Sequence, residues 1–114
     1  MKLPNGEQAE ISVQKLIGYC LNPEHPSGKH KAKVFASILG ITLENADVLR
    51  ELIQTAAVAG EVVQQSTTQF AQQFKVDWIV PDTDGIRLRT IWETTANNPY
   101  PRLITAFLKL NEQN

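Results

Sequence analysis

The sequence has one cysteine, two histidines, two tyrosines and two tryptophans, and these scarcities exclude several classes of protein. With Cys20 alone, the chain forms no internal disulfide and contains no C-x-x-C redox or zinc motif. The histidines His25 and His30 are five residues apart with Pro26 between them, so they lack the spacing that places two imidazoles on one helix face. We therefore expect neither a metal ion nor a cofactor.

Long apolar runs and an excess of one charge are also missing. No stretch approaches the roughly 20 apolar residues of a membrane span, and no apolar run of a signal peptide follows Met1. We expect a bacterial cytoplasmic protein that does not contact membranes. The 11 basic and 12 acidic residues give a net charge of −1, which excludes a polybasic nucleic-acid binder. The 42% of hydrophobic residues is typical of a globular domain and excludes a disordered tail.

The 114 residues correspond to one domain, with residues 1–10 as a loose leader and residues 111–114 as a polar tail. From Ser12 onward, apolar residues recur at helical spacing. Ser12 can cap this first helix, and Asn22 ends it because a residue before proline avoids helical backbone. The apolar stripe of this helix consists of Val13, Leu16, Ile17, Cys20 and Leu21.

Two further helices are predicted before residue 60. Ser27 is the expected cap of the second helix, which ends at Gly40, a residue type typical of helix ends. The third helix covers about residues 43–59, with Thr42 as its cap. Positive charge at a helix start opposes the helix dipole, yet the first turns of the second helix carry Lys29, Lys31 and Lys33.

Beyond residue 60 the apolar residues alternate, as they do in strands with one buried face. Val62 and Val63 mark a short first strand. Residues 74–80 and 86–92 form a hairpin around the turn signal at residues 81–85. The shared apolar face of this hairpin carries Val76, Trp78, Val80, Leu88 and Trp92, which we expect to lie in the core.

The requirement that the apolar side chains of both strands share one face predicts the register of the hairpin. A slip of one residue would send them to opposite faces. We predict that Val80 lies opposite Leu88 and that Lys75 lies opposite Glu93. Gly85 in left-handed conformation fits a three-residue loop with a bulge.

The last apolar run, residues 102–110, is apolar on both faces. This predicts an inner strand of the sheet, with a short C-terminal helix as the alternative. The order of elements therefore predicts an α+β fold. Two or three N-terminal helices pack on one face of a three- or four-stranded antiparallel sheet.

The most basic segment, residues 25–33, is a candidate anion site. Backbone N–H groups at a helix start can bind a phosphate when lysines lie nearby, and a histidine can transfer protons near neutral pH. A solvated helix start also explains this spacing, and it is the interpretation that the spacing alone favours. The apolar position of Cys20 favours a buried structural thiol over a nucleophile.

A second candidate surface is the outer face of the sheet. Arg87 and Arg89 project together and, with Lys75, could contact a nucleic-acid backbone. The nearby acids Asp77 and Glu93 favour the simpler interpretation, a solvated face with paired charges.

Two segments together resemble a family of small bacterial domains of unknown function. The first segment contains Leu16, Tyr19, Leu21, Asn22, Pro23, His25, Pro26, Gly28, Lys31, Ala32, Phe35, Leu39 and Gly40. The second contains Ile91-Trp92 and, further on, Pro101-Arg102-Leu103-Ile104-Thr105-Ala106. The resemblance covers about residues 14–108. Members of this family occur alone, next to small partner genes, or at the ends of larger toxin-like proteins.

In its element order the family is similar to the RNase fold shared by barnase, the EndoU nucleases, colicin tRNases and the RelE toxins. Such proteins cleave RNA without metal. The resemblance implies His25 as a base or acid, Lys31 and Arg102 as cations that stabilise phosphate charge, and Thr105 as the group that positions the phosphate. Arg102 and Thr105 are three residues apart, so they share a face only if Arg102 precedes the strand or lies at a bulge.

Two functional hypotheses from different classes follow. The first is an RNase-fold protein of toxin type that acts on RNA without metal. The second is a non-catalytic binding or antitoxin-like protein with the same fold, which acts through a small protein partner encoded nearby or as a homodimer. A degenerate member that keeps the fold without the site is a third interpretation.

Overall fold

A computed structural model describes residues 1–109, and residues 110–114, which include the predicted tail, lie outside the described part. Three helices precede the sheet, as the sequence predicts, and a short 3₁₀ turn comes before them. The first two begin as α-helix and continue as a wider π-helical turn. The helical elements are η1 (Gly6–Gln8), α1 (Val13–Lys15) with η2 (Leu16–Cys20), α2 (Lys29–Val34) with η3 (Phe35–Leu39), and η4 (Leu43–Asn45) leading into α3 (Ala46–Ala59).

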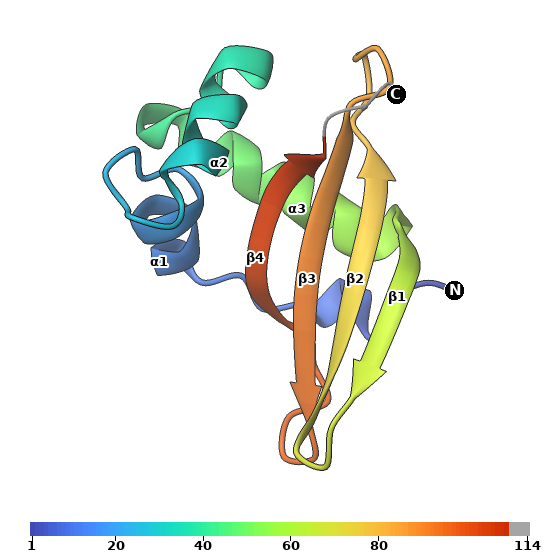
Figure 1. Cartoon of the computed structure of the whole chain (residues 1–114). Helices are drawn as coiled ribbons and strands as arrows, with labels where there is room; N and C mark the ends of the chain where they lie inside the picture. The colour runs from blue at the N-terminus through green and yellow to red at the C-terminus, as the bar shows by residue number, and fades with distance from the viewer. Residues whose placement is uncertain (110–114) are drawn as a thin grey trace.

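The sheet has four antiparallel strands in the order β1-β2-β3-β4. Its strands are β1 (Glu61–Thr67), β2 (Ala71–Ile79), β3 (Arg87–Thr95) and β4 (Arg102–Lys109). Helix α3 crosses one face of the sheet, while α1 and α2 lie beside β4 (Figure 1). The predicted α+β class is therefore confirmed, with three helices and four strands. The other face of the sheet is not covered by a helix in the described part of the chain (Figure 1).

The core lies between α3 and the sheet. Helix α3 contributes Leu49 and Ile53, and the strands contribute Phe74, Leu88 and Trp92, all at most 2% exposed. Burying a large apolar side chain contributes roughly 1.5–3 kcal/mol, so this layer holds the fold together. The indole N–H of Trp92 donates to the buried Thr90 hydroxyl at 2.7 Å, which satisfies both polar groups in the core.

The predicted ends of the helices are mostly confirmed. Ser12 accepts a hydrogen bond from the Gln14 N–H, and Thr42 forms a capping box with Asn45. Gly40 is left-handed at φ 69°, as expected after a helix end. The predicted apolar stripe of the first helix is wrong in part, because Val13 and Ile17 are 58% and 42% exposed. The wide π-helical turn changes the periodicity there.

The predicted hairpin faces are confirmed, but the predicted register is wrong by two residues. Val76 lies opposite Thr90 and Lys75 lies opposite Ile91, not opposite Glu93. The connection is longer than the expected three-residue loop. Thr83 holds it closed, because its hydroxyl donates to the Val80 carbonyl and accepts from the Ile86 N–H. Gly85 is left-handed as predicted, with φ 80°.

The last strand, β4, lies at an edge of the sheet, so the prediction of an inner strand is wrong. Its outer edge is covered by other parts of the chain. Glu10 bridges β4 through its N–H to the Pro101 carbonyl and its carbonyl to the Leu103 N–H. The first ten residues, expected to be loose, thus pack on the fold, and Leu3 is only 4% exposed. The second face of β4 is partly covered by the helices beside it, since the Lys31 ammonium of α2 lies over the Phe107 ring, which accounts for an apolar residue on that face.

Candidate functional site

The loop between α1 and α2 is organised by His25. Its Nδ1 accepts hydrogen bonds from the N–H groups of Ser27 and Gly28, at 2.9 and 3.0 Å. Gly28 is the N-cap of α2 and no side chain caps the helix, so the prediction of Ser27 as cap is wrong. His25 instead satisfies the amides that the sequence suggested for an anion. Because Nδ1 accepts these bonds, a neutral imidazole carries its proton on Nε2.

The ammonium of Lys31 is the centre of the candidate site. It donates to the Tyr19 hydroxyl at 2.7 Å and to the Thr105 hydroxyl at 3.4 Å. It also lies 4.9 Å from the centre of the Tyr19 ring and 5.0 Å from that of Phe107, both within the range of a cation–π contact. The site thus joins η2 and α2 to β4, whose Thr105 lies 74 residues after Lys31 in the sequence.

Lys31 changes the acidity of the phenol. Its hydrogen bond lowers the pKa of Tyr19 below the usual 10.0, against the effect of burial, which raises it. Thr105 and the positive charge of Lys31 add to the lowering. A phenol with a lowered pKa beside a cation is suited to proton transfer and to binding an anion.

Tyr19 links this cluster, which we call the Tyr19–Lys31–Thr105 cluster, to His25. The rings of Tyr19 and His25 pack edge to face with centres 4.8 Å apart. Both line a shallow pocket of about 620 Å³ over α1 and η2. Tyr19 belongs to the family pattern but had no predicted role, and its only signal in the sequence is a polar aromatic side chain within the apolar run of residues 16–21.

A close backbone contact holds the two halves of the site together. A Cβ atom on Gly28 would lie 2.5 Å from the Tyr19 carbonyl, so only glycine lets the His25 loop pack on the π-helical turn. Tyr19 belongs to that turn. π-Helical turns are frequent at functional sites.

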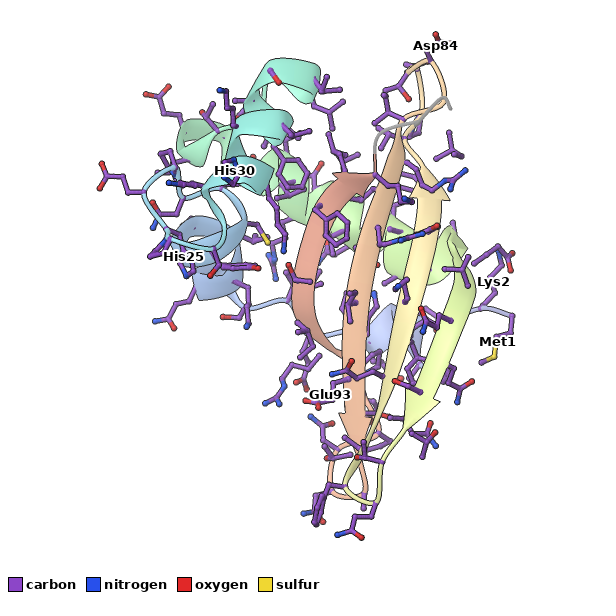
Figure 2. The ribbon with its side chains drawn as sticks, in the orientation of Figure 1. Met1, Lys2, His25, His30, Asp84 and Glu93 are labelled. Atoms are coloured by element: carbon purple, nitrogen blue, oxygen red, sulfur yellow. The ribbon has the colours of Figure 1, made fainter. Side chains whose placement is uncertain are left out.

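Arg102 is the predicted site residue that does not join the cluster. It pairs with Glu93 at 3.3 Å and is 58% exposed. A shift of register places Ile91 opposite Thr105 but Trp92 opposite Leu103, so Ile104 is the extra residue of a bulge. This bulge puts Arg102 and Thr105 on the same face of the sheet. Figure 2 shows Glu93 toward the far end of β3, away from His25.

The uncovered face of the sheet is richer in bases than the chain as a whole. By strand register, it carries Lys75, Arg87, Arg89, Arg102 and Lys109 against the acids Glu61, Asp77 and Glu93. Some of these charges are paired: Arg89 binds Asp77 through two bonds of 2.7 and 2.8 Å, and Arg87 lies 3.8 Å from Asp77. The predicted pairing of Arg87 and Arg89 is therefore confirmed for Asp77 but not for Glu93, which pairs with Arg102.

Cys20 is fully buried, as predicted for a structural thiol, and burial raises its pKa. Within residues 1–109, no group of three His, Cys, Asp or Glu side chains is placed to hold a metal ion. None of the helices in this part of the chain has the length and apolar character needed to cross a membrane.

The sequence matches the family described as "Domain of unknown function (DUF6883)" over residues 2–110, and the chain belongs to this family. This confirms the expected membership in a family of domains of unknown function. No curated protein and no solved structure matches the chain.

Proposed function

We propose that this domain is an RNase-fold protein of toxin type that cleaves RNA without a metal ion. The observation that carries the proposal is the Lys31 ammonium, which bonds the hydroxyls of Tyr19 and Thr105 beside the uncovered sheet face. Metal-independent cleavage needs a base, an acid and a cation near one phosphate. The Tyr19–Lys31–Thr105 cluster supplies the base and the cation, and water held beside His25 supplies the acid.

The residues divide the reaction between them. Tyr19, in its phenolate form beside Lys31, takes the proton of the ribose 2′-hydroxyl, and the 2′-oxygen then bonds to the neighbouring phosphorus. The P–O5′ bond breaks, a water molecule gives a proton to the leaving oxygen, and the Nε2–H of neutral His25 donates a hydrogen bond to that oxygen. The products are a 2′,3′-cyclic phosphate and a 5′-hydroxyl, and the hydroxide left by the water takes the proton back from Tyr19, which restores the phenolate.

Lys31 neutralises the charge that develops on the phosphate oxygens, and the Thr105 hydroxyl orients the phosphate. Arg102 is a proposed second phosphate contact on the same face, made when RNA competes with Glu93. The uneven charge of the molecule supports this arrangement. The net charge of −1 conceals a sheet face with five bases and three acids beside the cluster.

The test is cleavage of a 20-nucleotide single-stranded RNA by the purified domain in EDTA. We expect cleavage by the wild type and a loss of about 100- to 1,000-fold in Lys31→Met, because one charged donor to the phosphate is gone. Lys33→Met is the matched control, since Lys33 is exposed on another face of the same helix. Absence of cleavage by the folded wild type, or equal loss in both variants, overturns the proposal.

The second candidate, a non-catalytic binding or antitoxin-like protein, is favoured by one observation. Arg89 and Arg102 are already paired with Asp77 and Glu93 and are thus less available to RNA. This alternative expects a stable complex with the product of a neighbouring gene and no effect of His25→Ala or Lys31→Met on that complex. RNA cleavage that depends on Lys31 separates the two candidates.

A further inference from the structure

A second hollow lies on the side of α2 that faces away from the Tyr19–Lys31–Thr105 cluster. It is a groove of about 670 Å³ between α2 and the segment that contains η4. Its apolar lining includes Leu21, Pro23, Ala32, Ala36 and Leu43. Leu43 is 45% exposed, so the groove presents an apolar side chain to solvent.

Basic side chains border this groove. Lys29 and Lys33 are four residues apart on α2, which places them on one helix face, and His30 lies beside them. Lys31, two residues after Lys29, points to the other side and into the cluster. Lys29 and Lys33 therefore border the groove, whereas Lys31 belongs to the cluster on the other side of α2.

The two groove lysines are not explained by the fold. Neither forms an ion pair within residues 1–109. Lys29 begins α2, where positive charge opposes the helix dipole, whereas Lys33 lies in the last turn of that helix. Glu44, across the groove, is the acid in its lining. A negatively charged ligand at this place would pair with both lysines and offset the unfavourable position of Lys29.

We propose that the groove binds an acidic peptide segment of a partner protein with one apolar anchor residue. The carboxylates contact Lys29 and Lys33, and the anchor packs among Leu21, Ala36 and Leu43. The apolar lining favours a peptide over a nucleic-acid backbone, because polar phosphate and sugar groups do not bury the apolar side chains of the groove. Since the groove and the cluster lie on different sides of α2, the peptide and an RNA bind at the same time.

The experiment selects peptides from a random 12-residue phage-display library on the immobilised full-length domain. We expect enriched peptides with at least two acids and an apolar residue. Their affinity should fall about ten- to a hundredfold for Lys29→Glu/Lys33→Glu, because two favourable charge contacts become repulsive. The matched control Lys15→Glu/Lys75→Glu carries the same change of charge elsewhere and should bind normally.

A second variant keeps the test independent of charge and of folding defects. Ala36→Trp fills the groove without changing charge and should also abolish binding. The cluster variant Lys31→Met should bind peptide like the wild type, so a failure of the proposed RNase activity leaves this test intact. Failure to enrich peptides, enriched peptides that bind both Lys29/Lys33 and Ala36 variants normally, or displacement of the peptide by a 12-nucleotide RNA overturns the proposal.

Discussion

Lys31 shows how one side chain is held by several weak contacts of different kinds. It donates one short charge-assisted hydrogen bond, to Tyr19, and one longer bond, to Thr105. Two aromatic faces, each about 5 Å from the ammonium, complete its surroundings. The side chain is thereby oriented before any ligand arrives, which is what an electrostatic catalyst requires.

The acidity of Tyr19 tests this description directly. In a Tyr100→Phe background, Tyr19 is the remaining tyrosine of the chain, and its ionisation can be followed by absorbance near 295 nm. We expect a midpoint below 10.0 and a rise in Lys31→Met, because the hydrogen bond and charge of Lys31 lower this pKa. The folded pKa lies below the unfolded one, so the ionised phenol stabilises the fold above pH 10. That contribution is lost as the pH falls through the folded value.

An unchanged midpoint in Lys31→Met would contradict the hydrogen bond between the two side chains. Lys33→Met is the control, and it should leave the midpoint where it is. The same titration gives no information about cleavage, so it separates the geometry from the proposed function.

Asp77 stabilises the uncovered face of the sheet through its hydrogen bonds with Arg89. Asp77→Ala removes two short bonds to Arg89 and leaves that guanidinium, only 17% exposed, without its partner. We expect a loss of about 1–3 kcal/mol in the free energy of unfolding, measured in urea. Glu93→Ala breaks the exposed pair with Arg102 and should cost less than about 1 kcal/mol. Equal costs for the two variants would contradict this ranking.

Among the helical elements, starts and ends were predictable where side chains act locally. Ser12, Thr42 and Gly40 behave as their residue types suggest. Ser27 does not, because the helix begins one residue later with Gly28 as its N-cap, and the Lys29 N–H that a Ser27 cap would bond donates to the His25 carbonyl. A histidine whose ring and carbonyl both hold the loop has no simple signature in sequence, so the structure of the loop could not be predicted.

The contact between the His25 loop and η2 predicts a sharp difference between two glycines. In Gly28→Ala the added Cβ collides with the Tyr19 carbonyl, so we expect a loss of about 1–3 kcal/mol in stability. In Gly18→Ala nothing lies within 4 Å of the added atom. That variant should be neutral or stabilised by up to about 1 kcal/mol, because alanine favours helical backbone.

Thermal unfolding followed by circular dichroism compares the two glycine variants. A stable Gly28→Ala protein would show that the loop packs less closely on η2 than the contact indicates. The site would then lack the rigid link between His25 and Tyr19 on which the proposed division of roles depends.

For the strands, the alternation of residues predicted the faces but not the pairing. The register is set by Thr83, whose hydroxyl closes the connection after β2, and that bond cannot be read from the spacing. The position of β4 was missed for a related reason. The Glu10 segment covers its edge and Lys31 of α2 lies over Phe107, and both lie near β4 only in the folded chain.

At the scale of the whole molecule, the near-neutral charge constrains how RNA can bind. The uncovered face has several bases, but Arg87 and Arg89 share Asp77, and Arg102 has Glu93. Few cations are thus available to replace the counterions of RNA, chiefly Lys31, Lys75 and Lys109. Of the site residues that the family resemblance implies, Lys31 and Thr105 lie together in the structure, whereas Arg102 lies apart from them.

This charge distribution predicts a shallow dependence of RNA binding on salt. With about three phosphates neutralised, the plot of log affinity against log salt should have a slope of about −2 for a single strand. The measurement uses a 2′-O-methyl RNA, which lacks the reactive hydroxyl, and fluorescence anisotropy at several salt concentrations. A slope steeper than about −5 would indicate a broad electrostatic surface and contradict the account.

The most direct test of the central claim compares two substrates in EDTA. One is a 20-nucleotide single-stranded RNA, and the other is the same sequence with 2′-O-methyl groups throughout. The account predicts that the wild type cleaves the RNA to products with 2′,3′-cyclic phosphate ends, leaves the methylated strand intact, and loses cleavage in Lys31→Met but not in Lys33→Met. An intact RNA, or equal cleavage of both substrates, would contradict it.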